Sequence, residues 1–103
     1  MIRVSVMYPN SENVSFDMDY YATKHMPMVA GHCGDALRGM TIDSGLGGGA
    51  PGEAPTYIAM GHLIFDSMES FHAAFGPHMA EIMGDIPNYT AATPVIQFSE
   101  VTL

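Results

Sequence analysis

The spacing of the hydrophobic residues constrains the fold of this chain more than any other feature. Alternating or continuous apolar segments predict four strands, at residues 2–8, 37–43, 57–65 and 94–103. Helical spacing predicts one helix at residues 15–25 and another that starts at residue 66. The resulting order, β-α-β-β-α-β, predicts an α+β, ferredoxin-like fold with a four-stranded antiparallel sheet and two helices.

Local signals refine the ends of the helices. Met26 precedes Pro27, and the residue before a proline disfavours the helical conformation, so we expect the first helix to end there. For the second helix, Asp66 with Glu69 three residues later predicts a capped start. Gly76-Pro77 should bend that helix part of the way along.

The predicted layers leave one face of the sheet uncovered, because two helices can cover only the other. The uncovered face carries one of two apolar sets from the strand at residues 57–65, either Ile58, Met60 and Ile64 or Tyr57, Leu63 and Phe65. Either set is more apolar surface than a soluble chain leaves in water. We therefore predict a homodimer in which two sheets face each other.

The composition excludes several classes of partner. The net charge is −8 with only three Lys and Arg residues, so the basic footprint that nucleic acid requires is missing. An anionic membrane surface would repel the chain, and no apolar segment is long enough to span a bilayer. The length of 103 residues predicts a single domain over residues 1–103, which we expect to be cytoplasmic. Cys33 is the only cysteine, so no internal disulfide can form, and we interpret it as a buried hydrophobe.

Cofactor and metal motifs are weak. Gly45-x-Gly47-x-x-Ala50 resembles a dinucleotide fingerprint, but Pro51-Gly52 follows it and no helix begins there to hold a pyrophosphate. We interpret residues 45–52 as a flexible loop. No HExxH or two-histidine, one-carboxylate spacing occurs, and a proline separates His72 from His78. We predict no cofactor and no metal. A metal site whose ligands are distant in the sequence and meet only in the folded chain stays open.

One segment gathers most of the polar chemistry. Tyr20-Tyr21-Ala22-Thr23-Lys24-His25-Met26-Pro27-Met28 places two phenols, an ammonium and an imidazole on about two helical turns. Tyr21 and His25 are four residues apart and share one helix face, with Tyr20 and Lys24 on the neighbouring face. A histidine can act as a general acid or base, and a tyrosine beside it can hydrogen-bond a carbonyl or phenol oxygen. The alternative is a helix-terminal histidine with two tyrosines at the edge of the core.

Three motifs resemble those of the EthD family, which is named for ethyl tert-butyl ether degradation. The first is Tyr20-Tyr21-x-x-Lys24-His25-Met26-Pro27-Met28, similar to a tyrosine-rich helix that ends in His-x-Pro-Leu. The second, at residues 62–71, is similar to a strand that leads into Phe-Asp-Ser and a helix. The third is the turn Asp85-Ile86-Pro87-Asn88-Tyr89-Thr90, and the last strand at residues 94–101 fits as well. Met28 for the usual leucine and the glycine-rich loop are departures, so no loop residue is carried over.

The resemblance implies a dimeric α+β barrel with a ligand cleft between each sheet and its own helices. In that cleft we expect His25 to exchange a proton and Tyr21 or Tyr20 to orient an oxygen of a small apolar or aromatic compound. The reaction would be an oxidation, isomerisation, cyclisation or elimination at an acidic C–H. The residues expected to bind the substrate are Tyr20, Lys24, His62 and Tyr89.

Two other functions stay open at this point. A binding or accessory protein would hold a hydrophobic compound for an oxygenase, and His25 would then only end its helix and form hydrogen bonds. A haem protein would use His25, His62 or His78 as an axial ligand. The position of His25 relative to the cleft separates these readings, because only a cleft-facing imidazole can transfer a proton to a ligand.

Overall fold

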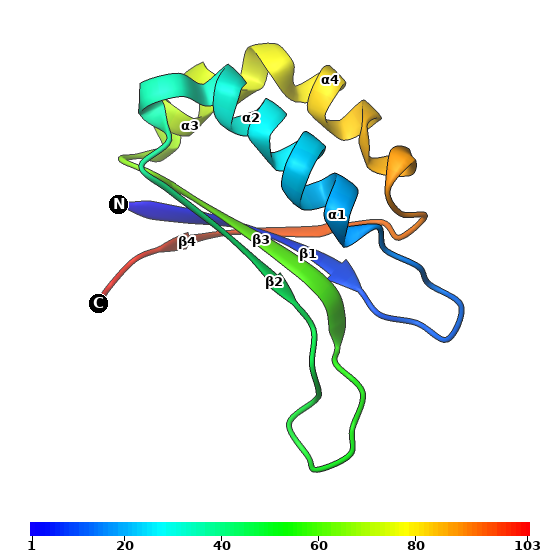
Figure 1. Ribbon diagram of the computed structural model, residues 1–103. Helices are drawn as coiled ribbons and strands as arrows, with labels where there is room; N and C mark the ends of the chain where they lie inside the picture. The colour runs from blue at the N-terminus through cyan, green and yellow to red at the C-terminus, as the bar shows by residue number, and fades with distance from the viewer.

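The computed structural model describes all 103 residues, and it confirms the predicted order of strands and helices. The strands are β1 (Ile2–Pro9), β2 (Gly39–Ser44), β3 (Tyr57–Phe65) and β4 (Val95–Glu100). They form one antiparallel sheet in the order β2-β3-β1-β4, which is the ferredoxin-like arrangement. Figure 1 shows the helices together on one side of this sheet and the β2–β3 loop projecting away from both layers.

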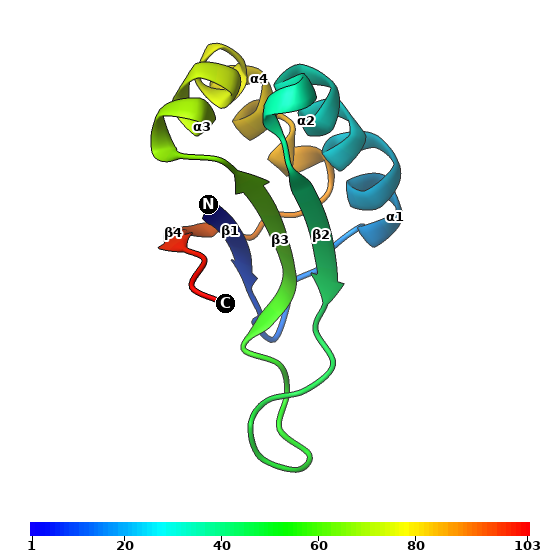
Figure 2. The ribbon, with the colours of Figure 1, turned by 90° about the vertical axis from the view of Figure 1, so that its left-hand side faces the viewer.

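Two helical runs connect the strands. The first comprises α1 (Met18–Tyr20), a π-helical turn (Tyr21–His25), α2 (Met26–Cys33) and a 3₁₀ turn (Gly34–Ala36). The second comprises α3 (Met68–Phe75), a 3₁₀ turn (Gly76–His78), α4 (Met79–Gly84) and a 3₁₀ turn (Ile86–Asn88). Figure 2 shows both runs above the same face of the sheet. None of these helices has the length and apolar character that crossing a membrane would need.

The prediction that the first helix ends before Pro27 is wrong. The chain continues from the π-helical turn into α2, with Pro27 in the first turn of that helix. In the π-helical turn the N–H of Met26 donates to the carbonyl of Tyr21, five residues earlier. The turn resets the hydrogen-bond pattern, so Pro27 lies at a helix start, where its missing N–H costs little.

The second helical run matches its prediction closely but starts one residue later. Its N-cap is Ser67 rather than Asp66, and the Ser67 hydroxyl accepts a hydrogen bond from the N–H of Ser70 at 3.0 Å. Phe71 and Phe75, four residues apart, are both buried against the sheet side of the helix layer. The predicted bend is confirmed, because a 3₁₀ turn at Gly76–His78 separates α3 from α4.

Alternation along the strands decides which apolar set the helices cover. Val4 of β1 pairs with Leu63 of β3, and both are buried beneath the helix layer. Side chains one residue along point to the opposite face. On β3 the uncovered set is therefore Ile58, Met60, His62 and Ile64, all of them half-buried.

Candidate functional site

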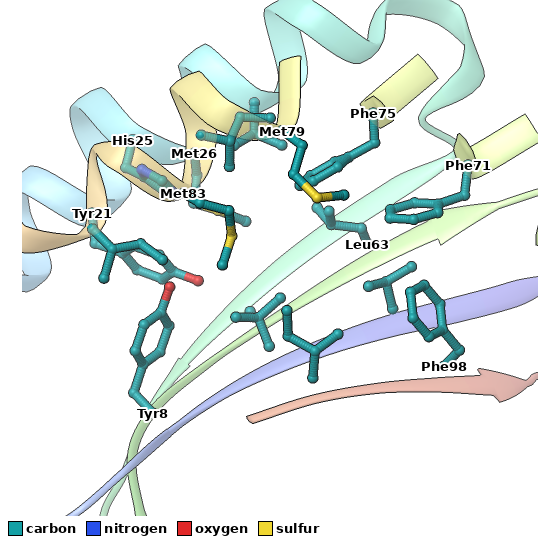
Figure 3. A pocket seen from close by; sticks show the side chains of 17 residues that line it. Tyr8, Tyr21, His25, Met26, Leu63, Phe71, Phe75, Met79, Met83 and Phe98 are labelled. Carbon is teal, nitrogen blue, oxygen red and sulfur yellow. The ribbon is translucent and has the colours of Figure 1, made fainter. Parts of the chain in front are cut away.

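A cavity of about 300 Å³ lies between the sheet and the helices (Figure 3). This volume is at the lower end of the range for small-molecule sites. Fifteen of the seventeen residues that line it are hydrophobic, and the other two are His25 and Gly61. Four lining residues from α4 and β4 are also exposed, so they form the rim of the cavity: Met79, Met83, Ile96 and Phe98.

Asp85 anchors the only histidine of the cavity. His25 is 3% exposed, and its Nδ1 lies 2.9 Å from Oδ2 of Asp85. The other carboxylate oxygen accepts hydrogen bonds from the Tyr20 hydroxyl at 2.7 Å and the Asn88 amide at 2.8 Å. Burial by itself would raise the pKa of Asp85, but the hydrogen bonds from Asn88, His25 and Tyr20 outweigh it and lower that pKa. Asp85 is therefore a stable carboxylate that holds the His25 ring in place.

This anchor determines which nitrogen of His25 is free. A carboxylate only accepts hydrogen bonds, so Nδ1 of His25 carries the proton that points at Asp85. Every fully buried side-chain nitrogen or oxygen in the chain has a hydrogen-bond partner, whereas Nε2 of His25 has none. Nε2 is therefore not fully buried, and it belongs to a side chain that lines the cavity. In the neutral ring Nε2 has a free lone pair and can accept a proton from a ligand.

Two buried phenols contact the His25 ring, and a third, Tyr8, packs against both of them. Tyr21 stacks on the His25 ring with ring centroids 5.6 Å apart, and the Tyr89 centroid lies 4.7 Å from that of His25. The hydroxyls of Tyr8 and Tyr89 are 2.6 Å apart, and Figure 3 shows those of Tyr8 and Tyr21 pointing toward one another. Burial is the largest cause that raises the pKa of all three tyrosines. They stay protonated at neutral pH, and Tyr8 and Tyr21 can donate hydrogen bonds to an oxygen in the cavity.

Gly61 of β3 allows Tyr21 to reach this position. A Cβ atom at residue 61 would collide with the Tyr21 hydroxyl, so any side chain there would displace the ring. The glycine is buried and lines the cavity between the sheet and the π-helical turn. The close approach of a tyrosine to the strand backbone explains why a glycine occupies the middle of a central strand.

The structure brings three of the predicted site residues together. His25 and Tyr21 line the cavity, and Tyr89 packs against both of them. Tyr20 is half-buried and reaches Asp85 from outside the cavity. Lys24 is exposed, with its ammonium 5.6 Å from the centre of the Tyr20 ring. Neither Tyr20 nor Lys24 lines the cavity, so neither is placed to contact a ligand in it.

The predicted place of His62 in the cleft is corrected by the structure. Gly61 and Leu63 of β3 point toward the cavity, so His62 between them points to the opposite face. There its ring nitrogens contact Ser5 and Asp43. The sequence pattern of β3 shows two faces but does not show which one the helices cover.

Four of the five histidines lie outside the cavity. No group of three His, Cys, Asp or Glu side chains is arranged to hold a metal ion. His32 and His78 stack on each other at 4.0 Å between centroids, with Glu81 in contact with His32, but only His25 lines the cavity. Cys33 is buried and burial raises the pKa of its thiol, in keeping with a hydrophobic role.

Sequence reasoning missed two residues that the structure places in the site. Asp85 is 60 positions from His25, and Tyr8 is 81 positions from Tyr89, so no local spacing connects these pairs. Tyr8 was visible only as the last apolar residue of β1. For Asp85 the available signal was its position at the start of the motif at residues 85–90.

Comparisons with known proteins agree with the motifs and the fold. The family model of the EthD domain matches residues 12–93. The crystal structure of an EthD-like protein from Ralstonia eutropha JMP134 is 49% identical in sequence, with a TM-score of 0.94 over 99% of this chain and 92% of that chain. No curated protein matches the sequence.

Two more distant structures share the fold alone. An ethyl tert-butyl ether degradation family protein from Bacillus halodurans C-125 is 17% identical, with a TM-score of 0.68 over 99% of both chains. A protein from Arabidopsis thaliana is 10% identical, with a TM-score of 0.70 over 100% of this chain and 97% of that chain. At such identities the likeness extends to the arrangement of strands and helices and not to chemistry.

Proposed function

The chain belongs to the EthD family, and we propose that it binds a small apolar or aromatic compound in the sheet–helix cavity and catalyses proton transfer at an acidic C–H of that compound. The observation that carries this proposal is the orientation of His25. Its Nδ1 is held by Asp85, which leaves Nε2 as the unpaired nitrogen of a side chain that lines an otherwise apolar cavity. An imidazole in this arrangement is typical of a general acid or base.

The cavity supports a ligand of a particular kind. Its walls are almost entirely apolar, so they favour a hydrocarbon or aromatic body. The hydroxyls of Tyr8 and Tyr21 lie at one end beside His25, where they would accommodate a carbonyl or phenol oxygen. A ketone with an acidic C–H next to its carbonyl meets both requirements.

The proposed step uses three groups of the chain. Nε2 of His25 removes the proton from carbon, and the hydroxyls of Tyr8 and Tyr21 stabilise the enolate oxygen that forms. His25 then returns the proton to another position, which gives an isomerisation, or the enolate carbon attacks within the same molecule, which gives a cyclisation. The raised pKa values of both tyrosines keep them as hydrogen-bond donors through this step.

Hydrogen–deuterium exchange of a ketone tests the proton transfer directly. The probe is 2-tetralone in D₂O, followed by NMR, with wild-type protein, His25→Ala and His72→Ala. His72 is an exposed histidine on α3, so its variant is the matched control. We expect His25→Ala to slow the catalysed exchange by about 10²–10⁴-fold and His72→Ala to leave it unchanged.

A parallel measurement separates catalysis from binding. 2-Naphthol has a similar aromatic body and can be followed through its own fluorescence. Binding of 2-naphthol without exchange of 2-tetralone would favour the accessory or binding function over the enzyme. Full exchange activity in a folded His25→Ala variant would refute the role proposed for this histidine.

We also propose that the chain works as a homodimer. The helices cover one face of the sheet, while Met7, Met60 and Ile64 remain only half-buried on the other. Both edge strands, β2 and β4, have one unpaired side. A second copy placed sheet to sheet would bury this surface and form the α+β barrel that the family resemblance implies.

A further inference from the structure

A short hydrogen bond joins the wall of the cavity to a residue behind it. The hydroxyl oxygens of Tyr8 and Tyr89 are 2.6 Å apart, and both side chains are buried. Tyr8 lines the cavity, whereas Tyr89 does not. The Tyr89 hydroxyl has no hydrogen-bond partner other than Tyr8. Its effect on a ligand in the cavity therefore has to pass through the Tyr8 hydroxyl.

The surroundings of the two hydroxyls decide which one donates. If Tyr8 donated, the proton of the Tyr89 hydroxyl would stay buried without an acceptor, which costs free energy. If Tyr89 donates, the Tyr8 proton is free for an acceptor in the cavity. The Tyr21 hydroxyl, which points toward that of Tyr8 in Figure 3, is one such acceptor. The second arrangement gives both protons a partner, so Tyr89 is the donor.

The ionisation of the pair agrees with this direction. Burial is the largest influence and raises the pKa of both phenols. The hydrogen bond between them lowers the pKa of Tyr8 and raises the pKa of Tyr89. These opposite effects arise because an accepted hydrogen bond stabilises a phenolate, whereas a donated one is lost when the donor ionises. A phenol that accepts a hydrogen bond also becomes a stronger donor of its own proton.

One turn supports both polar groups of the cavity. Tyr89 belongs to residues 85–90 together with Asp85, whose carboxylate holds Nδ1 of His25. The carbonyl of Tyr89 accepts a hydrogen bond of 2.9 Å from the N–H of Asp17, at the start of α1. The Tyr89 ring also packs on the His25 ring, with centroids 4.7 Å apart. These contacts hold the Tyr89 phenol in a fixed position behind the cavity wall.

We propose that Tyr89 is a positioning residue that donates to the Tyr8 oxygen and thereby strengthens the hydrogen bond that Tyr8 gives to a ligand oxygen. The inference rests on the proposed function, because it concerns the same cavity. A strengthened donor matters most for an oxygen that carries or gains negative charge. The cavity therefore selects enolisable ketones and phenols over ethers and hydrocarbons of the same shape.

Two probes of matched shape measure this selection without any chemistry. 2-Naphthol has an oxygen that can accept from Tyr8, whereas 2-methylnaphthalene has none, and both are followed through their own fluorescence. Tyr89→Phe removes one hydroxyl and keeps the ring. We expect this variant to bind 2-naphthol about two- to tenfold more weakly and 2-methylnaphthalene as the wild type does. Tyr57→Phe removes the hydroxyl of a half-buried tyrosine outside the cavity, so it should change neither affinity.

A double-mutant cycle tests whether Tyr89 acts through Tyr8. Tyr8→Phe should weaken the binding of 2-naphthol, and adding Tyr89→Phe should have no further effect, because the acceptor of its hydrogen bond is already gone. Circular dichroism checks that each variant is folded, and the double variant leaves neither hydroxyl unpaired. Effects of the two substitutions that multiply would overturn the proposal. Equal affinities of the wild type and Tyr89→Phe for 2-naphthol would do the same.

Exchange of 2-tetralone separates this inference from the proposed function. We expect Tyr89→Phe to lower kcat about tenfold with a smaller change in KM, because the oxygen gains its charge only in the transition state. Absence of exchange in every protein, with the expected binding pattern intact, would refute the catalysis and support the role of Tyr89 in binding. Exchange that depends on His25 but is unchanged in Tyr89→Phe would overturn this inference alone. A wild type that does not bind 2-naphthol would overturn both.

Discussion

Asp85 organises the candidate site from the end of α4. Its carboxylate receives three donors that come from different parts of the fold, namely the π-helical turn, α1 and the turn that follows α4. Because it accepts from Nδ1 of His25, it leaves Nε2 as the ring nitrogen that is free for another contact. The residue therefore acts on the chemistry through the position of another side chain.

Replacing Asp85 by Asn should show this positioning role in two measurements. An amide can present either end to His25, so the ring loses its fixed orientation, and exchange of 2-tetralone should fall by about ten- to a hundredfold. The lowered pKa of Asp85 means that the carboxylate adds stability above its unfolded pKa of about 4, and that this stability is lost as pH falls through the folded pKa. Thermal midpoints between pH 6 and pH 2.5 should therefore fall less steeply in Asp85→Asn than in the wild type.

Asp66→Asn is the matched control for this variant. Asp66 forms an exposed ion pair with Arg38, with their closest atoms 3.1 Å apart, and such pairs add little to stability. It should retain the wild-type exchange rate and a nearly wild-type acid slope. Equal acid slopes in Asp85→Asn and the wild type would contradict the stabilising role assigned to Asp85.

Sequence spacing predicted the site residues that lie close together in the chain. Tyr21 and His25 share a face because four residues separate them, and the structure places both on the cavity. The residues that complete the site from other parts of the chain could not be predicted in this way. Asp85 and Tyr8 meet the helix only through tertiary packing, and their distance along the chain carries no periodic signal.

The elements of the fold were predictable where periodicity alone decides them. The strand order followed from the sequence of period-two and helical segments, whereas the π-helical turn did not, since it spans one turn of a short helical run and no residue type marks it. Pro27 then predicted an end where the helix in fact continues. The face of β3 that carries His62 was also undecided, because it depends on which residues the helices cover.

The spacing between β3 and the π-helical turn depends on Gly61. In Gly61→Ala the new methyl group would press on the Tyr21 hydroxyl, and the helix layer or the ring must move. We expect a loss of about 1–3 kcal/mol in the free energy of unfolding, measured by urea denaturation, because overpacked cores cost energy of this order. Binding of 2-naphthol should weaken as well, since Tyr21 lines the cavity.

Gly31→Ala provides the control at a glycine of the helix layer. Gly31 is exposed in α2, and a Cβ there would meet no atom within 4 Å. Alanine in a helix interior is favoured over glycine by roughly 0.5–1 kcal/mol, so this variant should be as stable as the wild type or slightly more stable. A Gly61→Ala protein with the stability of Gly31→Ala would show that the helix layer is not held at this distance by the glycine.

The whole molecule presents two chemically different faces of one sheet. Toward the helices lies the apolar cavity with His25, and on the other side lies the polar row of Ser5, His62 and Gln97 with methionines beside it. A homodimer would cover only the second face. Sedimentation equilibrium should therefore give twice the chain mass of 11.1 kDa at micromolar concentration.

Association has to overcome the charge of the chain, which is −8 on each copy. Salt screens this repulsion, so the dimer should strengthen between 20 mM and 300 mM NaCl. Met60→Asp adds a carboxylate to the uncovered face and should give a monomer. Ala73→Asp adds the same charge at an exposed position of α3, so this variant should stay dimeric. A wild-type chain that sediments as a monomer at 100 µM in 300 mM NaCl would refute the sheet-to-sheet dimer, since burial of that apolar face would then be too weak to hold two copies together.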